Sequence, residues 1–276
     1  MSTTERPVSQ RRASVAAFLG LAGALAVGVY SPLVLPELGD VGELALYLAG
    51  SLGVVALALV VTHRMPVHAV PAELGMDRGV LQGLAWALVL TVPMLLGFLV
   101  LRRGVFFEPG GMDDLTERPW AVLQSWAGAG LVEETLFRGY FFRQLVRRGG
   151  WPAGRAMLLC GLVFGLLHVP GAWGEPAGEI VGAVAVTAIG GAAFCWMLLR
   201  WDWNLWFVIG WHAFVNLWWT LGQGGDTAAG DGLSNALRLG VVALTVVATI
   251  RHGRLSKHSM GSTPEHQAQT QRPGDT

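Results

Sequence analysis

The sequence predicts an all-α protein, a polytopic bundle of about eight transmembrane helices. Composition is the first reason: 53% of the 276 residues are hydrophobic, only 14% are charged, and the mean hydropathy is +0.48. The second is that the apolar residues fall in runs of about 20, the length that crosses the hydrocarbon core as a helix. The third is that the 38 glycines are scattered through these runs, where small residues let helices pack closely.

The apolar runs define the predicted spans, with charges and Gly or Pro clusters as their ends. The spans cover approximately residues 14–34, 42–62, 80–101, 120–142, 156–173, 180–199, 203–222 and 234–250. We interpret the first as a retained signal anchor, because it is long for a cleaved signal and no convincing cleavage site follows it. The fifth is the shortest.

Basic residues predict the orientation, because cytoplasmic loops are enriched in Lys and Arg. If the N-terminus is cytoplasmic and the loops alternate, the opposite side receives only Arg102, Arg103 and Arg118. The cytoplasmic side receives Arg6, Arg11, Arg12, Arg64, Arg78, Arg143, Arg147, Arg148, Arg155, Arg200, Arg251, Arg254, Lys257 and Arg272. We therefore expect an integral protein of a bacterial plasma membrane with both termini in the cytoplasm.

Charge and cysteine content exclude several classes of function. Lys plus Arg and Asp plus Glu number 19 each, so no global basic field exists to bind nucleic acid, and the expected partners are the lipid bilayer and a substrate. Cys160 and Cys195 lie inside apolar runs, where a thiol behaves as a small hydrophobe. We predict five parts along the chain. They are a cytoplasmic segment (1–13), N-terminal transmembrane helices (14–118), a catalytic core (119–221), a last transmembrane helix (222–255) and a disordered tail (256–276).

Few ionisable groups lie inside the predicted spans, and such groups are costly enough in lipid to indicate a functional site. The fourth, fifth and seventh spans carry Glu133, Glu134, Arg138, His168, His212 and Asn216. Measured from the charged cytoplasmic ends, Glu133, His168 and His212 all lie roughly 15 to 20 Å deep, near the middle of a core about 30 Å thick. Three helices thus place polar groups at one depth, which predicts a shared site.

Helical spacing suggests what these groups do. Glu134 and Arg138 are four residues apart, so they share a face and can form an ion pair. Glu133 lies about 100° away and is left free. His212 and Asn216, also four apart, would present a ring N–H and an amide side by side. A carboxylate that takes a proton from water, with two donors for the developing negative charge, is sufficient to hydrolyse a peptide bond.

Other interpretations stay open. The Glu134 and Arg138 pair, a helix contact by His168, and interhelical bonding by Asn216 can each be purely structural. Two histidines and a glutamate can also bind zinc, which would make the protein a metalloprotease, but HExxH is absent and we expect no cofactor. A non-proteolytic transporter or scaffold is the third alternative, and the lack of an evident internal repeat disfavours a transporter.

Three motifs, in this order and on separate spans, resemble those of the CPBP family, also called the Abi or CAAX-protease-like family of intramembrane endopeptidases. They are EExxxR at 133–138, FxxxH at 164–168 and HxxxN at 212–216, and the resemblance covers roughly residues 119 to 221. It implies a helical bundle around a polar intramembrane cavity, with Glu133 as the base that activates water. His168 would position the water or shuttle its proton.

Under this hypothesis His212 and Asn216 stabilise the oxyanion, and Glu134 and Arg138 support the site without touching substrate. The expected substrate is a membrane-associated or C-terminally tagged peptide or protein. We expect it to enter from the cytoplasmic side or from the bilayer, past a basic rim made of Arg143, Arg147, Arg148 and Arg155.

Overall fold

The computed structural model describes residues 8–34, 39–102, 122–170, 173–174, 176–224 and 230–260, and every regular element within them is helical. The elements are α1 (Gln10–Val34), α2 (Gly39–His63), η2 (Val67–Ala69), α3 (Val70–Leu74), α4 (Val80–Leu101), η3 (Gln124–Glu133), η4 (Thr135–Phe142), α8 (Arg143–Arg147), α9 (Ala153–Leu166), α10 (Ala177–Arg200), α11 (Leu205–Leu221) and α12 (Gly232–Met260). The predicted all-α class is confirmed for these residues.

Four helices among the described residues are long and apolar enough to cross a membrane, which supports a polytopic membrane protein. They comprise Val41–His63, Val80–Leu101, Ala177–Arg200 and Gly232–His252. The other four predicted spans overlap α1, η3 plus η4, α9 and α11, although α9 ends at Leu166 and not at 173, and a total of eight stays a prediction. Helix α12 continues to Met260, into the predicted tail, whereas 1–7 and 261–276 lie outside the described residues.

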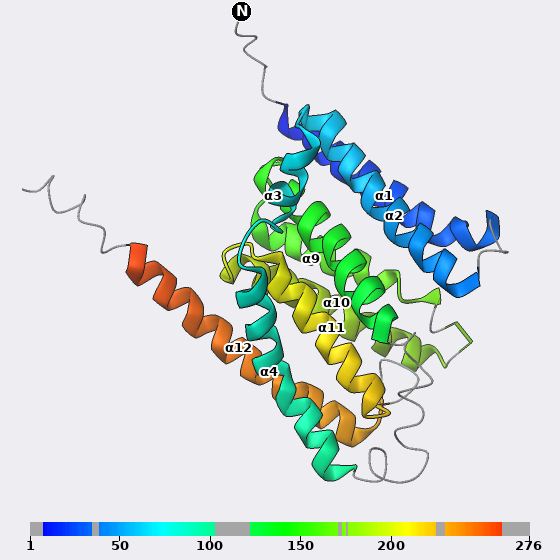
Figure 1. The fold of residues 1–276 in the computed structure, drawn as a ribbon, viewed down its shortest axis with the longest axis vertical. Helices are drawn as coiled ribbons and strands as arrows, with labels where there is room; N and C mark the ends of the chain where they lie inside the picture. The colour runs from blue at the N-terminus through cyan, green and yellow to red at the C-terminus, as the bar shows by residue number, and fades with distance from the viewer. Residues whose placement is uncertain are drawn as a thin grey trace, which may run out of the picture.

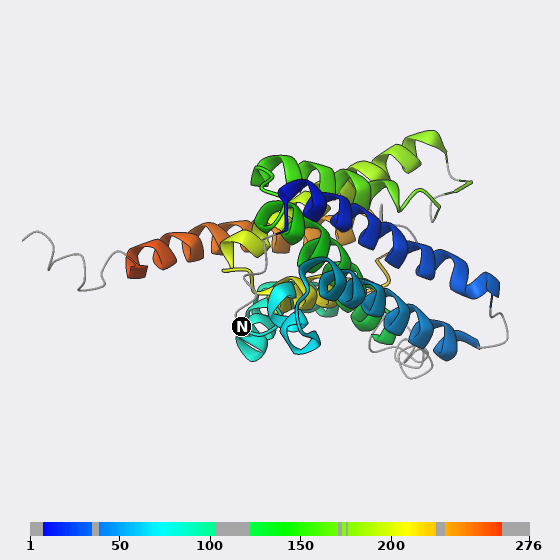
Figure 2. The same cartoon turned by 90° about the horizontal axis from the view of Figure 1, so that it is seen from above.

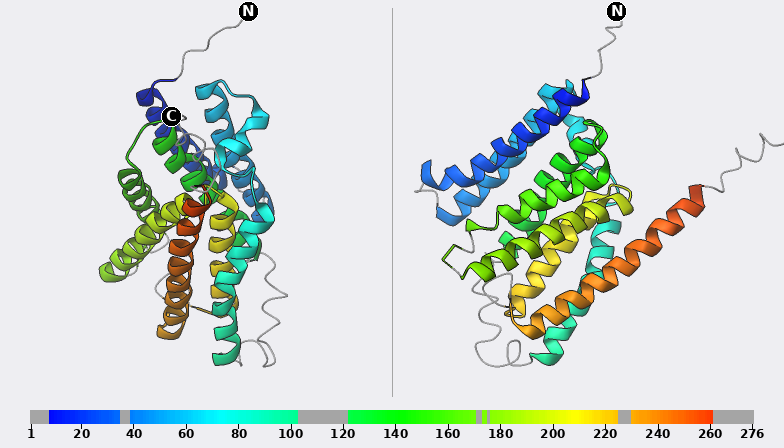
Figure 3. Two further views of the ribbon diagram at one scale, coloured as in Figure 1. Left: turned by 90° about the vertical axis from the view of Figure 1, so that its left-hand side faces the viewer. Right: turned by 180° about the vertical axis from the view of Figure 1, so that it is seen from behind.

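The helices lie side by side in a slanted array (Figure 1). The α1 and α2 hairpin forms one flank, α4 and α12 form the other, and α9, α10 and α11 lie between them (Figure 3). The most extensive contacts join α9 to α10, α4 to α11 and α1 to α2, while η3 packs on both α11 and α2. Seen from above, the end of α12 reaches well beyond the other helices (Figure 2). The segment η3 to η4 therefore sits between the two flanks.

Small residues allow α9 and α10 to approach closely. A Cβ atom on Gly161 would lie 2.5 Å from the carbonyl oxygen of Ala188, and one on Gly165 would lie 2.6 Å from that of Val184. Side chains at these positions would push the two backbones apart. The glycine spacing is the small-xxx-small pattern typical of membrane helix pairs.

We expect Gly161→Ala to destabilise the protein. Alanine favours helix by about 0.5–1 kcal/mol over glycine, but the added methyl meets backbone that cannot yield, and overpacking costs about 1–3 kcal/mol. Thermal unfolding can be followed with a thiol-reactive dye, because Cys160 and Cys195 are both free and buried. Gly190→Ala is the control, since its Cβ would meet nothing within 4 Å. Equal melting temperatures for both variants would contradict close packing at Gly161.

The loop of residues 64–79, between α2 and α4, holds the beginning of α11. The backbone N–H of Leu205 donates to the carbonyl of Gly75 at 3.1 Å, and the indole N–H of Trp206 donates to that of Met76 at 2.9 Å. Gly75 has φ +84°, in the left-handed region that favours glycine. This loop therefore supplies acceptors that the first turn of α11 needs.

The same loop occupies part of the predicted basic rim. Glu73 accepts two hydrogen bonds from Arg148, at 2.9 and 3.0 Å, and one from Gln144 at 2.9 Å. Burial alone would raise the pKa of Glu73, but these hydrogen bonds outweigh it and hold the pKa below its ordinary value. Arg143 is buried and donates to the carbonyl of Ala72 at 3.1 Å. Arg148 and Arg143 thus join the loop to α8 and are not free to form a rim.

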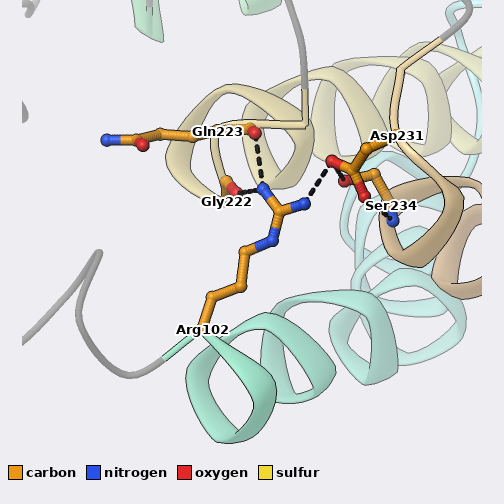
Figure 4. A network of polar contacts seen from close by, with 5 residues as sticks. All are labelled: Arg102, Gly222, Gln223, Asp231 and Ser234. Atoms are coloured by element: carbon orange, nitrogen blue, oxygen red, sulfur yellow. Dashed lines mark hydrogen bonds and ion pairs between the residues drawn. The ribbon is translucent and has the colours of Figure 1, made fainter.

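A second polar network joins three helices around Arg102 (Figure 4). Arg102 follows α4 and donates to the carbonyls of Gly222 at 2.8 Å and Gln223 at 2.6 Å, where α11 ends, and it also bonds Asp231. Asp231 accepts from the backbone N–H of Ser234 at 3.0 Å, at the start of α12. Bonds from Ser234 and Arg102 hold the pKa of Asp231 well below its usual range. A cation at a helix C-terminus also complements the helix dipole.

Candidate active site

The helix that carries the EExxxR motif is wound as a π helix in two stretches, Gln124–Glu133 and Thr135–Phe142, with Glu134 between them. Such winding is rare and often accompanies functional sites. Gly130 lets η3 lie directly on α11. A Cβ atom on Gly130 would be 2.8 Å from the Cβ of Ala213. The two adjacent carboxylates are therefore held against α11.

The carboxylate of Glu134 joins two helices. Its Oε1 atom accepts from Nη1 of Arg138 at 2.8 Å and lies 2.7 Å from Nδ1 of His212 on α11. The side chains of Glu134 and Arg138 are fully buried, and that of His212 is 13% exposed. The predicted ion pair between Glu134 and Arg138 is confirmed. The bond to His212 was not predicted, and it makes Glu134 the link between Arg138 and that imidazole.

Aromatic rings enclose the guanidinium of Arg138. Its central carbon lies 4.3 Å from the ring centroid of Phe164, 4.9 Å from that of Phe194 and 5.8 Å from that of Phe137. A cation over aromatic faces is attracted by their quadrupoles, more strongly where water is excluded. The rings therefore offset part of the cost of burying the arginine. No periodicity in the sequence indicates this enclosure, because the phenylalanines come from three separate helices.

His212 is held in one orientation with a defined tautomer. An ionised Glu134 can only accept, so the ring donates through Nδ1–H. The ring also packs on Phe194, with centroids 5.1 Å apart. Neutral His212 then carries no proton on Nε2, whereas protonated His212 has a second donor there.

His168 lies in the turn after α9, which ends at Leu166, whereas the predicted span 156–173 placed it inside the helix. Its backbone N–H donates to Gly165 at 3.1 Å, and Pro170 disfavours helix for the residue before it. Nδ1 of the ring lies 2.8 Å from the carbonyl of Phe164. A carbonyl can only accept, so Nδ1 carries the proton and Nε2 of the neutral ring is an acceptor.

Glu133 is half-buried and interacts electrostatically with both His212 and His168. The structure thus brings five of the six predicted residues together, from three chain segments. Asn216 is half-buried one turn after His212 on α11, and within the described residues no hydrogen bond ties it to the other five. Its predicted place beside His212 follows from helical spacing alone.

A metal site was the main chemical alternative. Metal-binding histidines usually donate their other N–H to a carboxylate or carbonyl, as His212 and His168 do here. However, no group of three or more His, Cys, Asp or Glu side chains within the described ranges is arranged to hold a metal ion. The two histidines therefore have the hydrogen-bond partners typical of metal ligands, but the described side chains do not have the arrangement that holds a metal ion.

Comparison with known families gives one match. Residues 116–218 match the model of the type II CAAX prenyl endopeptidase Rce1-like family. The matched segment is less than half of the chain, and it contains all six predicted site residues. Searches of curated proteins and of solved structures found no match. The resemblance in the three motifs is thereby confirmed, and the chain contains a domain of the Rce1-like CAAX endopeptidase family, a family of intramembrane proteases.

Proposed function

We propose that this protein hydrolyses a peptide bond of a membrane-associated or C-terminally tagged peptide or protein, using water activated by Glu133. The observation that carries the proposal is the contact between Glu134 and His212, at 2.7 Å, beside a second carboxylate. This arrangement places a base and an oriented imidazole next to each other on different helices. The family match favours proteolysis over a transporter or scaffold.

In the proposed reaction, Glu133 takes a proton from water, and the water oxygen attacks the carbonyl carbon of the substrate. The intermediate carries a negative oxygen, which hydrogen-bond donors stabilise. The C–N bond then breaks, and the leaving nitrogen takes the proton from Glu133. His168, as an acceptor through Nε2, holds one hydrogen of the water in line with attack.

The tautomer of His212 limits its role. Because Nδ1–H is committed to Glu134, the ring can donate to an oxyanion from Nε2 only as an imidazolium. Arg138 bonds the same oxygen of Glu134 and so fixes the carboxylate that orients the ring. We therefore assign His212, with a proton on each ring nitrogen, and Asn216 as the two donors to the oxyanion.

The proposal is tested with purified protein in sealed vesicles and a set of peptides ending in a CAAX sequence, with and without a prenyl group on the cysteine. We expect release of a C-terminal fragment, measured by mass spectrometry, and no loss of rate with a zinc chelator. Release that stops with chelator and returns with added zinc would replace this mechanism with the metal-dependent one. Failure of every peptide in folded protein would count against an endopeptidase of this substrate class.

Membrane placement completes the proposal. We place the protein in a bacterial plasma membrane with eight spans around a polar cavity and both ends in the cytoplasm, supported by the distribution of Lys and Arg. In the same vesicles, tags on the two ends should be equally accessible to an added protease. Opposite accessibility of the two tags would require an odd number of spans.

A further inference from the structure

Phe194 on α10 contacts both partners of the Glu134 carboxylate. The centroid of its ring lies 5.1 Å from that of the His212 imidazole and 4.9 Å from the central carbon of the Arg138 guanidinium. Those two side chains bond the same oxygen of Glu134. Phe194 belongs to none of the three motifs, and it is buried. A ring from a separate helix therefore packs on the two groups that Glu134 links.

The Phe194 ring is itself held in place by its neighbours. A Cβ atom on Gly191, three residues earlier on α10, would lie 3.2 Å from Nη2 of Arg138, so the helix backbone approaches the site closely there. The indole of Trp211 on α11 packs edge to face on the Phe194 ring, with centroids 5.3 Å apart. The indole N–H of Trp211 donates to the hydroxyl of Thr245 on α12 at 2.8 Å. Three helices thus fix the surface that Phe194 presents to His212.

A hydrogen bond alone does not fix the direction of an imidazole. The bond with Glu134 holds Nδ1 of His212, but the torsion that rotates a histidine ring has broad energy wells. A second ring packed on the imidazole, here tilted by 47°, restricts that rotation and sets where Nε2 points. Phe164 also lies near His212, but its centroid is farther away, at 6.4 Å, and it packs on His168 as well. Of the two rings, Phe194 is therefore the closer constraint on His212.

We propose that Phe194 is a positioning residue, which directs Nε2–H of His212 toward the oxyanion of the intermediate. This inference rests on the proposed function. Phe194 has no polar side-chain atom, so it acts through His212. The oxygen of the substrate carbonyl gains its negative charge only as water attacks, so a correctly aimed donor stabilises the transition state more than the bound substrate. Loss of the aim should therefore lower kcat and leave KM nearly unchanged.

The test is Phe194→Leu, assayed for cleavage of the best peptide in vesicles, alone and combined with His212→Ala. Alone, it should lower kcat by about 10- to 100-fold, part of the loss of about 10²- to 10³-fold that follows removal of an oxyanion donor, with KM within about twofold. Combined with His212→Ala, it should lower kcat by no more than about a further twofold, because residues that act as a unit are not additive. If the leucine variant does not fold, Phe194→Met gives the same test, since its flexible side chain fills the space without a ring.

Phe98→Leu is the matched control, because Phe98 on α4 is also a buried ring near a guanidinium, that of Arg102 at 5.6 Å. It should lower the melting temperature and leave the kcat of the folded protein unchanged. If Phe194→Leu behaves like this control, or lowers kcat by the same factor with and without His212, the positioning role is wrong. The proposed function then stands as long as Glu133→Gln is inactive. If Glu133→Gln is as active as the wild type, the proposed function itself fails.

Discussion

Glu133→Gln is expected to lower kcat by about 10²- to 10⁴-fold, the usual contribution of a positioned general base. The amide has nearly the same shape but cannot accept a proton from water at neutral pH. Glu133 forms no ion pair in the described part of the chain, so the substitution breaks no salt bridge there. The measurement is the rate of peptide release by protein reconstituted in vesicles.

Folding must be shown to be intact for this result to bear on mechanism. Glu179→Gln is a suitable control, since Glu179 is exposed in the first turn of α10. Both variants should melt with the wild type, and only Glu133→Gln should lose activity. Wild-type rates in Glu133→Gln would refute the assignment of the base.

Arg138→Met is expected to cause the largest loss of stability, about 3–5 kcal/mol, the cost of leaving one member of a buried ion pair without its partner. Glu134 and Arg138 have no exposed side-chain surface, so solvent cannot compensate for the missing charge. Cleavage should fall as well, because Arg138 and His212 bond the same oxygen of Glu134. Without Arg138, the carboxylate that orients His212 is no longer held in place. Melting temperature and peptide release are the two measurements.

A second substitution separates charge from packing. In the double variant Glu134→Gln with Arg138→Met, no unpaired charge remains, and stability should recover substantially because apolar replacement of a buried pair is often neutral. Cleavage should stay low, since His212 loses the carboxylate that orients its ring. Arg147→Met is the control, because Arg147 is exposed on α8, and it should change stability by no more than about 0.5 kcal/mol. A single variant as stable as this control would show that the pair contributes little.

Local spacing in the sequence was sufficient for contacts within one helix. Glu134 and Arg138 are four residues apart and form the predicted pair even though the helix has π winding there. The depths of Glu133, His168 and His212 predicted one site, and in the structure both imidazoles lie around the ring of Phe164 and interact electrostatically with Glu133. Depth was a useful signal because apolar spans have charged ends that act as markers.

Contacts between distant segments could not be predicted in the same way. Glu134 and His212 are separated by 78 positions, and their bond depends on how η3 and η4 pack on α11. The end of α9 before His168 was missed because the apolar run was extended to residue 173, although Pro170 and Gly171 within it favour a turn. The sequence also carried no sign that two of the four predicted rim arginines, Arg148 and Arg143, bond to residues 72 and 73 of another segment.

The attachment of the loop 64–79 to α11 sets a boundary for protein engineering. A chimera that transplants only residues 116–218 into another membrane scaffold would separate Leu205 and Trp206 from the carbonyls of Gly75 and Met76. Leaving the buried N–H of Leu205 without an acceptor costs about 1–3 kcal/mol, and the partly buried indole of Trp206 adds to this. The smallest transferable unit therefore begins before residue 64. The segment that matches the family, 116–218, is shorter than the segment needed to hold its own helices in place.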